Sequence, residues 1–94
     1  MKYPILVTHV HVSPIKEPIG KLRAFVRITL NEAFQLTQLR LYEGENGLFV
    51  GYPIDPAQKG EEYRQMFYPL TRELREEIDR IVIAEYLKVK EAMQ

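Results

Sequence analysis

Cysteine is missing from the sequence. Its absence excludes disulfide bonds, thiolate nucleophiles and zinc sites with sulfur ligands, and it agrees with a reducing compartment. Long apolar runs are missing as well. No stretch approaches the roughly 20 apolar residues that span a membrane, and residues 1–12 lack the pattern of a signal peptide. We therefore expect a cytoplasmic protein that does not enter a membrane.

An excess of either charge is also lacking. The 13 basic and 13 acidic residues cancel, so net charge gives no indication of nucleic-acid binding. The sequence has no glycine-rich phosphate loop and no nucleophile elbow, and nothing near Ser13, the only serine, is expected to activate its hydroxyl. We therefore predict that the protein is not an enzyme and uses neither a cofactor nor a small-molecule substrate.

What the sequence does contain is typical of one globular domain. The chain has 94 residues, of which 46% are hydrophobic and 28% are charged, a balance that argues against disorder. No repeat, linker or low-complexity tract divides it. We expect a single domain over residues 1–94, small enough for self-association to add to its stability.

Alternating and β-branched segments predict strands. The clearest alternation covers 21–30, where the even-numbered residues are apolar and the opposite side carries Arg23, Phe25 and Arg27. The other strands are expected at 5–12, 34–43, 48–52 and 63–68.

Turns and one irregularity separate or interrupt these segments. The apolar phase changes within 34–43, which predicts a bulge near Thr37. Leu48 and Phe49 are interpreted as core and interface residues. The residues that favour turns are Pro14, Pro18 and Gly20 after the first strand, and Asn46 and Gly47 before the fourth.

A helix is expected after Thr71, a suitable N-cap followed by acidic residues that favour the first turn. Strands followed by one helix predict an α+β fold, an antiparallel sheet of about five strands with the C-terminal helix packed on it. The apolar residues that share one helix face are Leu74, Ile78, Ile81, Val82 and Val89.

Several motifs together resemble the SpoVG family, named after stage V sporulation protein G. The central ones are ITLNEAF at 28–34 and LRLYEGENGLFVGYP at 39–53. VTHVHV at 7–12 is similar to the opening strand of the family, and GEEYRQMFYPLTRELREEI at 60–78 is similar to its later segment. The resemblance runs in order along most of the chain.

The resemblance implies a small bacterial regulator associated with DNA and RNA binding, with septation and with the control of gene expression. It also implies a dimer built on an antiparallel sheet with a C-terminal helix. Arg64 and Arg75 match basic positions of the family, and Arg23 and Arg40 match positions that are usually Lys or Arg in the sheet. The family has His and Asp where this chain has Tyr68 and Gln65.

Two groups of residues are candidates for contact with nucleic acid. Arg23, Arg27 and Phe25 share a strand face on which cations would hold phosphates and the aromatic ring would stack a base. The alternative is an ordinary solvated face on which a neighbouring element covers Phe25. The second group, Arg64, Arg72 and Arg75, surrounds the helix start, where free N–H groups favour anions. Its alternative is a set of ion pairs with Glu61, Glu62, Glu73 and Glu76.

Two further features concern metals and partners. His9 and His11 share a strand face, but two ligands are too few for a closed metal site, so we predict no metal. Ile83 and Leu87 lie on the helix opposite Leu74, and a helix that is apolar on both sides is usually buried on both. We therefore expect a homodimer with Ile83 and Leu87 at its interface, unless the loop 53–60 covers them. A dimeric adaptor that acts through protein contacts is the alternative to a nucleic-acid-binding regulator.

Overall fold

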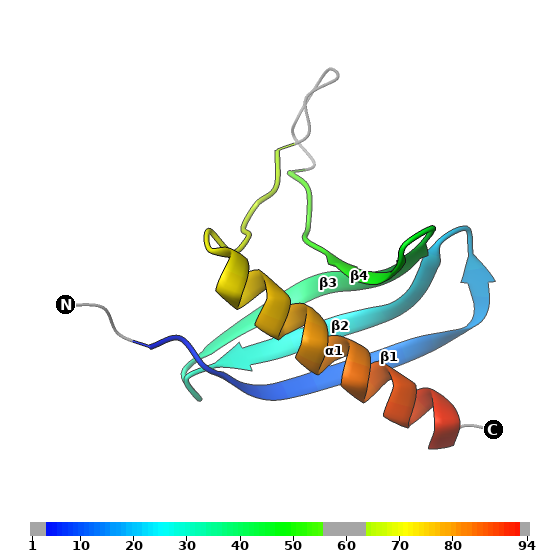
Figure 1. Ribbon diagram of the computed structural model, residues 1–94, viewed down its shortest axis with the longest axis horizontal. Helices are drawn as coiled ribbons and strands as arrows, with labels where there is room; N and C mark the ends of the chain where they lie inside the picture. Colours follow the sequence, from blue (N-terminus) through cyan, green and yellow to red (C-terminus); the bar gives the residue numbers. More distant parts are fainter. Residues whose placement is uncertain (1–3, 56–63, 93–94) are drawn as a thin grey trace.

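A computed structural model describes residues 4–55 and 64–92. Four strands form one antiparallel sheet in the order β1-β2-β3-β4, so that neighbours in the sequence are neighbours in the sheet (Figure 1). One helix, α1, follows the sheet. The bounds are β1 Val7–Ile19, β2 Leu22–Leu30, β3 Phe34–Gly44, β4 Gly47–Gly51 and α1 Arg72–Ala92. This arrangement confirms the predicted α+β fold.

The central strand β2 has the two faces that its alternation predicts. Ala24, Val26 and Ile28 are buried, whereas Phe25 and Arg27 between them are exposed. Because successive side chains of a strand point to opposite sides, one side of the sheet is apolar and must be covered.

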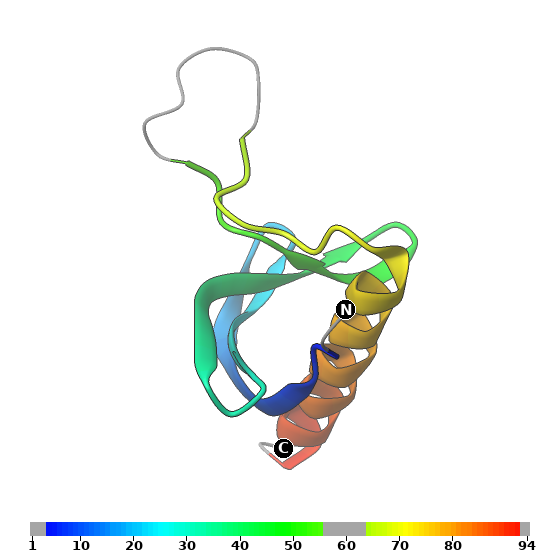
Figure 2. The same cartoon turned by 90° about the vertical axis from the view of Figure 1, so that its left-hand side faces the viewer.

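The helix α1 covers that apolar side. Its first turn is capped as predicted, since the Leu74 N–H donates a hydrogen bond to Thr71 Oγ1 at 3.2 Å. The helix contacts β1 and β4, the two edge strands, and Figure 2 shows it against one side of the curved sheet. The buried core comprises Val12, Ala24, Val26, Ile28, Leu39, Leu41, Val50 and Tyr52 from the strands and the segment after β4, and Ile78, Val82 and Tyr86 from the helix.

The other side of the sheet, which we term the outer face, points away from α1. No described helix covers it (Figure 2). Alternation from the buried residues of each strand places Phe25, Arg27, Arg40, Tyr42 and Phe49 on the outer face.

The predicted bulge near Thr37 is confirmed. Val26 pairs with Leu39 and Ile28 pairs with Leu36, so β3 holds one more residue than β2 in this interval. Gln38 within it has a φ of 66°, a left-handed conformation that is uncommon for a residue with a side chain. The extra residue changes the phase of β3 so that Leu36, Leu39 and Leu41 can all turn toward the core.

The predicted turn at Pro14 and Pro18 is wrong. β1 continues through both residues to Ile19, and the turn follows at Gly20, whose φ is 56°. β1 is an edge strand, and edge strands tolerate proline because one of their sides needs no ladder hydrogen bonds. The β3–β4 turn lies where expected, although only Gly47, and not Asn46, has positive φ.

The expected fifth strand is not a strand among the described residues. Gln65 forms only an isolated bridge with Ile54, and residue 63 lies outside the described ranges. Two hydrogen bonds hold the segments together, from the Asp55 N–H to the Arg64 carbonyl at 2.7 Å and from the Met66 N–H to the Pro53 carbonyl at 2.8 Å. Pro53 has no N–H group to extend this pairing toward β4.

Within the described residues no helix, α1 included, is long and apolar enough to cross a membrane. The 21 residues of α1 include Arg, Lys, Glu and Asp along most of its length.

Candidate nucleic-acid interface

A row of side chains crosses the whole outer face. Ser13 pairs with Phe25, Phe25 pairs with Arg40, and Arg40 pairs with Gly51, so each of the four strands contributes one residue. The side chains of directly opposed residues lie close enough to interact. Phe25 and Arg40 therefore occupy the middle of the outer face.

Phe25 and Arg40 form a cation–aromatic contact. The Arg40 guanidinium carbon lies 5.9 Å from the centre of the Phe25 ring. Phe25 still exposes 46% of its surface, so no element among the described residues covers it fully, contrary to the alternative considered above. An apolar ring held in solvent beside a cation can bind a flat, charged partner.

Tyr42 and Phe49 form a second aromatic site on the outer face. Their ring centres lie 5.6 Å apart at an interplanar angle of 27°, a stacked pair across β3 and β4. Two glycines, which have no Cβ atom, allow the rings to pack directly against the sheet. A Cβ atom at Gly51 would collide with the Tyr42 ring, and one at Gly44 would lie 3.1 Å from Phe49 Cε1.

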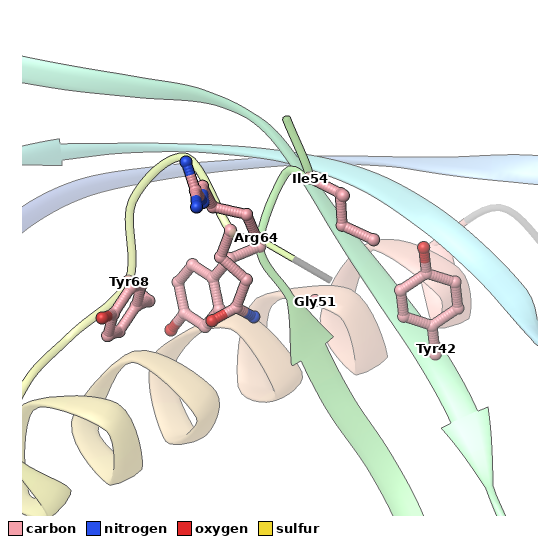
Figure 3. A pocket seen from close by; sticks show the side chains of 7 residues that line it. Tyr42, Gly51, Ile54, Arg64 and Tyr68 are labelled. Atoms are coloured by element: carbon pink, nitrogen blue, oxygen red, sulfur yellow. The ribbon is translucent and has the colours of Figure 1, made fainter. Parts of the chain in front are cut away.

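Three open hollows adjoin one another along this face. The first hollow has a volume of about 270 Å³. The second has a volume of about 570 Å³ and extends to His11 and Ser13 on β1. Phe25 and Gln38 line both. The third, of about 530 Å³, shares Tyr42 and Gly51 with the first. Figure 3 shows the third hollow, with Tyr42, Gly51, Ile54, Arg64 and Tyr68 around it.

The charge around these hollows is positive. Arg27, Arg40 and Arg64 each line one of them, and no acidic residue is among the described residues that line any of the three. An anion could therefore approach the outer face without meeting a carboxylate in the hollows. Charges beyond roughly 10 Å are screened at physiological salt, so this local balance matters more than the neutral net charge.

Arg23 is bound to the protein itself. Its Nε lies 3.2 Å from Glu43 Oε1, and its Nη1 donates hydrogen bonds to the carbonyls of Gly20 at 2.8 Å and Leu22 at 3.1 Å. The guanidinium thus fastens the β1–β2 turn to β3. Of the two arginines predicted on β2, Arg27 is the one without a described ion pair.

The three arginines expected at the helix start have separate environments. Arg72 is largely exposed and lies 3.9 Å from Glu76, which agrees with the ion-pair alternative. The Arg75 guanidinium lies 6.0 Å from the centre of the Tyr52 ring. Arg64 lines a hollow with Tyr42 instead, so the structure brings it to the outer face. The alternative partners Glu61 and Glu62 lie outside the described residues.

Tyr52 joins the helix to the end of β4. Burial raises its pKa to about 12, the nearby Asp79 charge adds to this increase, and Arg75 opposes it. The Tyr52 hydroxyl is buried without a hydrogen-bond partner among the described residues. Burial also raises the pKa of Asp79, although a hydrogen bond from the Val50 backbone lowers it.

The two histidines stand on the exposed side of β1. His11 Nε2 lies 3.2 Å from Ser13 Oγ, so the structure places an imidazole beside Ser13 that the sequence analysis did not consider. No described carboxylate is hydrogen-bonded to this imidazole, and both side chains are exposed. Among residues 4–55 and 64–92, no group of three or more His, Cys, Asp or Glu residues is placed to hold a metal.

The residues expected at a dimer interface differ in burial. Ile83 is partly buried and packs against the core of its own chain. Leu87 exposes 52% of its surface. Most of the loop that was the alternative cover, 53–60, lies outside the described residues.

Sequence reasoning missed Tyr42 as a site residue. It interpreted Phe49 as a core or interface residue, whereas Phe49 lies outside the core of its own chain and is 45% exposed. Phe49 and Gly51 alternate with the apolar residues of β4, and this alternation alone places Phe49 on the outer face. The stacking of Phe49 on Tyr42 depends on the β3–β4 register, which the turn at 45–46 fixes.

Comparison with known proteins gives a consistent family. A family model described as SpoVG matches residues 5–88. The "Putative septation protein SpoVG" of Anaeromyxobacter sp. (strain Fw109-5) is 36% identical over 80 residues, which cover 85% of this chain and 79% of the relative. The "Putative septation protein SpoVG 2" of Listeria monocytogenes serotype 4b is 39% identical over 75 residues, 80% of this chain and 72% of the relative. The "Putative septation protein SpoVG" of Lachnospira eligens is 34% identical over 84 residues, which cover 89% of this chain and 93% of the relative.

Proposed function

The chain belongs to the SpoVG family, and on this premise we propose that it is a small bacterial regulatory protein, related to septation, that binds nucleic acid through the outer face of its sheet. The observation that carries the proposal is the run of adjoining hollows lined by Arg27, Arg40 and Arg64 together with exposed aromatic rings, and by no described acidic residue. Sheets that bind nucleic acid commonly combine basic side chains, which contact phosphates, with aromatic side chains, which stack on bases.

The distribution of charge supports this role despite the neutral total. Glu73, Glu76, Glu77 and further acidic residues belong to α1, which lies on the opposite side of the sheet. The same helix also carries Arg72, Arg75, Arg80, Lys88 and Lys90, so its charges nearly cancel. The support therefore comes from the lining of the three hollows, in which the described charged residues are all basic. We propose binding rather than catalysis, because the contact between the Ser13 hydroxyl and the His11 imidazole is exposed and no third group among the described residues is hydrogen-bonded to that imidazole.

The alternative role is a dimeric adaptor that acts through protein contacts. It would use the exposed side of α1, where Leu87 is an exposed apolar residue among charged ones. This role predicts no dependence of function on Arg27 or Arg40, which lie on the other side of the molecule.

A salt titration tests the proposed function. We expect the purified protein to bind mixed pools of labelled DNA and RNA at low salt, with an affinity that decreases steeply as salt increases. The double variant Arg27→Ala/Arg40→Ala removes two phosphate contacts, so the slope of log affinity against log salt should decrease in magnitude by about 1.4 to 1.8. Fluorescence anisotropy measures both quantities.

The matched control is Arg72→Ala/Arg80→Ala, which removes the same charge from exposed positions of α1. We expect its affinity and salt slope to stay close to those of the unaltered protein. An equal loss in both double variants would show that binding follows total charge or the helix, and it would contradict an outer-face site. A protein that binds no pool at low salt favours the adaptor role.

A further inference from the structure

The geometry of the outer face points to the form of nucleic acid that it takes. We infer that the ligand is a single strand with unstacked bases, one lying on Phe25 and another on the Tyr42–Phe49 pair. This inference rests on the proposed function and adds to it the class of ligand and the role of each aromatic residue.

The first argument is the accessibility of ring surfaces. Phe25 exposes 46% of its surface and Phe49 exposes 45%, although both residues belong to regular strands of the sheet. An aromatic ring stacks only on a base whose face is free. Bases inside a duplex have both faces covered by their neighbours and present only their edges, whereas a single strand offers free faces.

The second argument is the separation of the two aromatic sites. Phe25 lies on β2 and Phe49 lies on β4, with β3 between them. Adjacent strands are about 4.8 Å apart, so Phe25 and Phe49 are separated by roughly 10 Å, and Tyr42, which is diagonal to Phe25 on β3, is separated from it by roughly 7 to 8 Å. Successive stacked bases are only about 3.4 Å apart. A chain that places one base on each site must therefore have its bases splayed, which an intact duplex does not allow.

The third argument is the position of the cations relative to the rings. Arg40 lies between the two aromatic sites, opposite Phe25 on one side and Gly51 on the other. Arg27 and Arg64 line the hollows at the two ends of the run. A backbone that follows the three hollows thus meets Arg27, Arg40 and Arg64 in turn. Phe49 borders a further hollow, whose lining includes Lys21 and Glu45. The guanidinium of Arg40, already near the Phe25 ring, can also stack on a base.

A purely structural role explains only part of this arrangement. Tyr42 and Phe49 lie over Gly51 and Gly44, so they also stabilise the β3–β4 hairpin. Phe25 contacts Arg40 but covers no glycine of the sheet, because its cross-strand partners are Ser13 and Arg40. Phe25 is therefore the aromatic residue of the outer face that is most suitable for the test.

The experiment compares a single-stranded oligonucleotide with the same sequence annealed to its complement, using fluorescence anisotropy at one low salt concentration. We expect the single strand to bind at least tenfold more tightly than the duplex. The Phe25→Leu variant keeps the apolar bulk and loses the aromatic face, and it should weaken single-strand binding by roughly tenfold. Duplex binding should change little.

The matched control is Phe34→Leu. Phe34 is 64% exposed at the start of β3 but lines none of the three hollows. Its replacement makes the same chemical change outside the site, so single-strand affinity should stay within about twofold. Circular dichroism of both variants shows whether the fold is retained.

A fluorescent reporter tests the second aromatic site directly. The chain has no tryptophan, so Phe49→Trp introduces a single indole on the Tyr42 ring. Its emission should be quenched when the single strand binds, because a base then stacks on it, and should change little with duplex.

The outcomes separate the inference from the proposed function. Binding that is at least as tight to duplex as to single strand, or unchanged by Phe25→Leu, overturns the inference and leaves the proposed function standing. A protein that binds neither form at low salt overturns both. Binding to single strands that is reduced by Phe25→Leu but not by Phe34→Leu supports both.

Discussion

Among single residues, Tyr52 combines tight packing with an unpaired polar atom. Its ring packs edge-on against Phe67, with ring centres 6.5 Å apart, and the residue is only 6% exposed. Its hydroxyl has no hydrogen-bond partner among the described residues. A buried hydroxyl that lost its water and gained no partner contributes nothing favourable to the free energy of unfolding. The ring, and not the hydroxyl, therefore accounts for the contribution of Tyr52 to stability.

The Tyr52→Phe variant should be as stable as the unaltered protein at neutral pH, within about 1 kcal/mol, or more stable. The difference in stability between the variant and the unaltered protein should increase at alkaline pH. The pKa of Tyr52 is about 12 in the folded protein and 10.0 when exposed, so above pH 10 unfolding releases the hydroxyl proton, and the unaltered protein loses stability as the pH increases from 10 toward 12. The variant should gain at most roughly 2 to 3 kcal/mol over the unaltered protein in that interval.

Urea denaturation at several pH values from 8 to 12 measures this difference. Tyr68→Phe is the control, because Tyr68 is 51% exposed and its hydroxyl reaches solvent. A Tyr52→Phe variant whose stability remained parallel to that of the unaltered protein over the whole range would contradict the assigned cause.

Gly51 gives a second prediction at this scale. Its φ is not in the left-handed region, so alanine fits the backbone, but the new Cβ would displace the Tyr42 ring. Gly51→Ala should therefore destabilise the protein by about 1 kcal/mol through loss of the aromatic pair. It should also weaken single-strand binding although every arginine is retained.

A double-mutant cycle isolates this effect. In a Tyr42→Leu background the ring is already gone, so Gly51→Ala should cost little or should stabilise, since alanine suits a strand better than glycine. Additive effects of the two substitutions on the free energy of unfolding would show that the ring and the glycine are independent.

At the scale of secondary-structure elements, the first turn of α1 depends on one side chain. Thr71 accepts the Leu74 N–H at 3.2 Å, and this hydrogen bond satisfies one of the free donors of the helix start. Thr71→Ala should cost about 1 kcal/mol and lower the melting temperature by about 4 to 8 °C. Thr71→Ser should restore most of the loss. Nucleic-acid affinity should not change, because Thr71 lines none of the hollows on the outer face.

Local patterns predicted the elements wherever the pattern and the packing agree. The alternation in β2 and the change of phase in β3 report directly which side chains reach the core, so both the strand and the bulge were predictable. Pro14 and Pro18 led to the wrong prediction of a turn. Proline ends a central strand but is tolerated in an edge strand, and a single sequence does not reveal which strand is the edge. The expected fifth strand failed because Pro53 limits its pairing to one bridge.

The candidate site was predictable only in its local part. Phe25 and Arg27 share a face within one strand, and the sequence is sufficient to show this. The contribution of Arg64 depends on how the segment before α1 returns to β4, and the pairing of Tyr42 with Phe49 depends on cross-strand register. Both are long-range contacts, which no local pattern specifies.

At the scale of the whole molecule, the predicted homodimer stays a prediction, and the structure changes how it should be tested. Ile83 packs against its own core, so Ile83→Asp should unfold the chain. Leu87 is 52% exposed, so Leu87→Asp should keep the fold and, if the helix forms the interface, yield a monomer. Light scattering at micromolar concentration and circular dichroism measure the two properties. A Leu87→Asp variant that remains a folded dimer would place the interface elsewhere.

The order of the elements has a consequence for synthesis of the protein. The apolar side of the sheet is formed by residues between Val12 and Val50, yet the helix that covers it begins only at Arg72. A ribosome adds about 5 to 20 residues per second, so the nascent sheet stays uncovered for roughly 2 to 8 seconds while the residues between the end of β4 and the end of α1 are added. During this interval we expect trigger-factor-like chaperones to bind the growing chain. A ribosome-stalled chain extended just far enough to release β4 but not α1 from the exit tunnel should crosslink to such chaperones, whereas one extended far enough to release α1 as well should not.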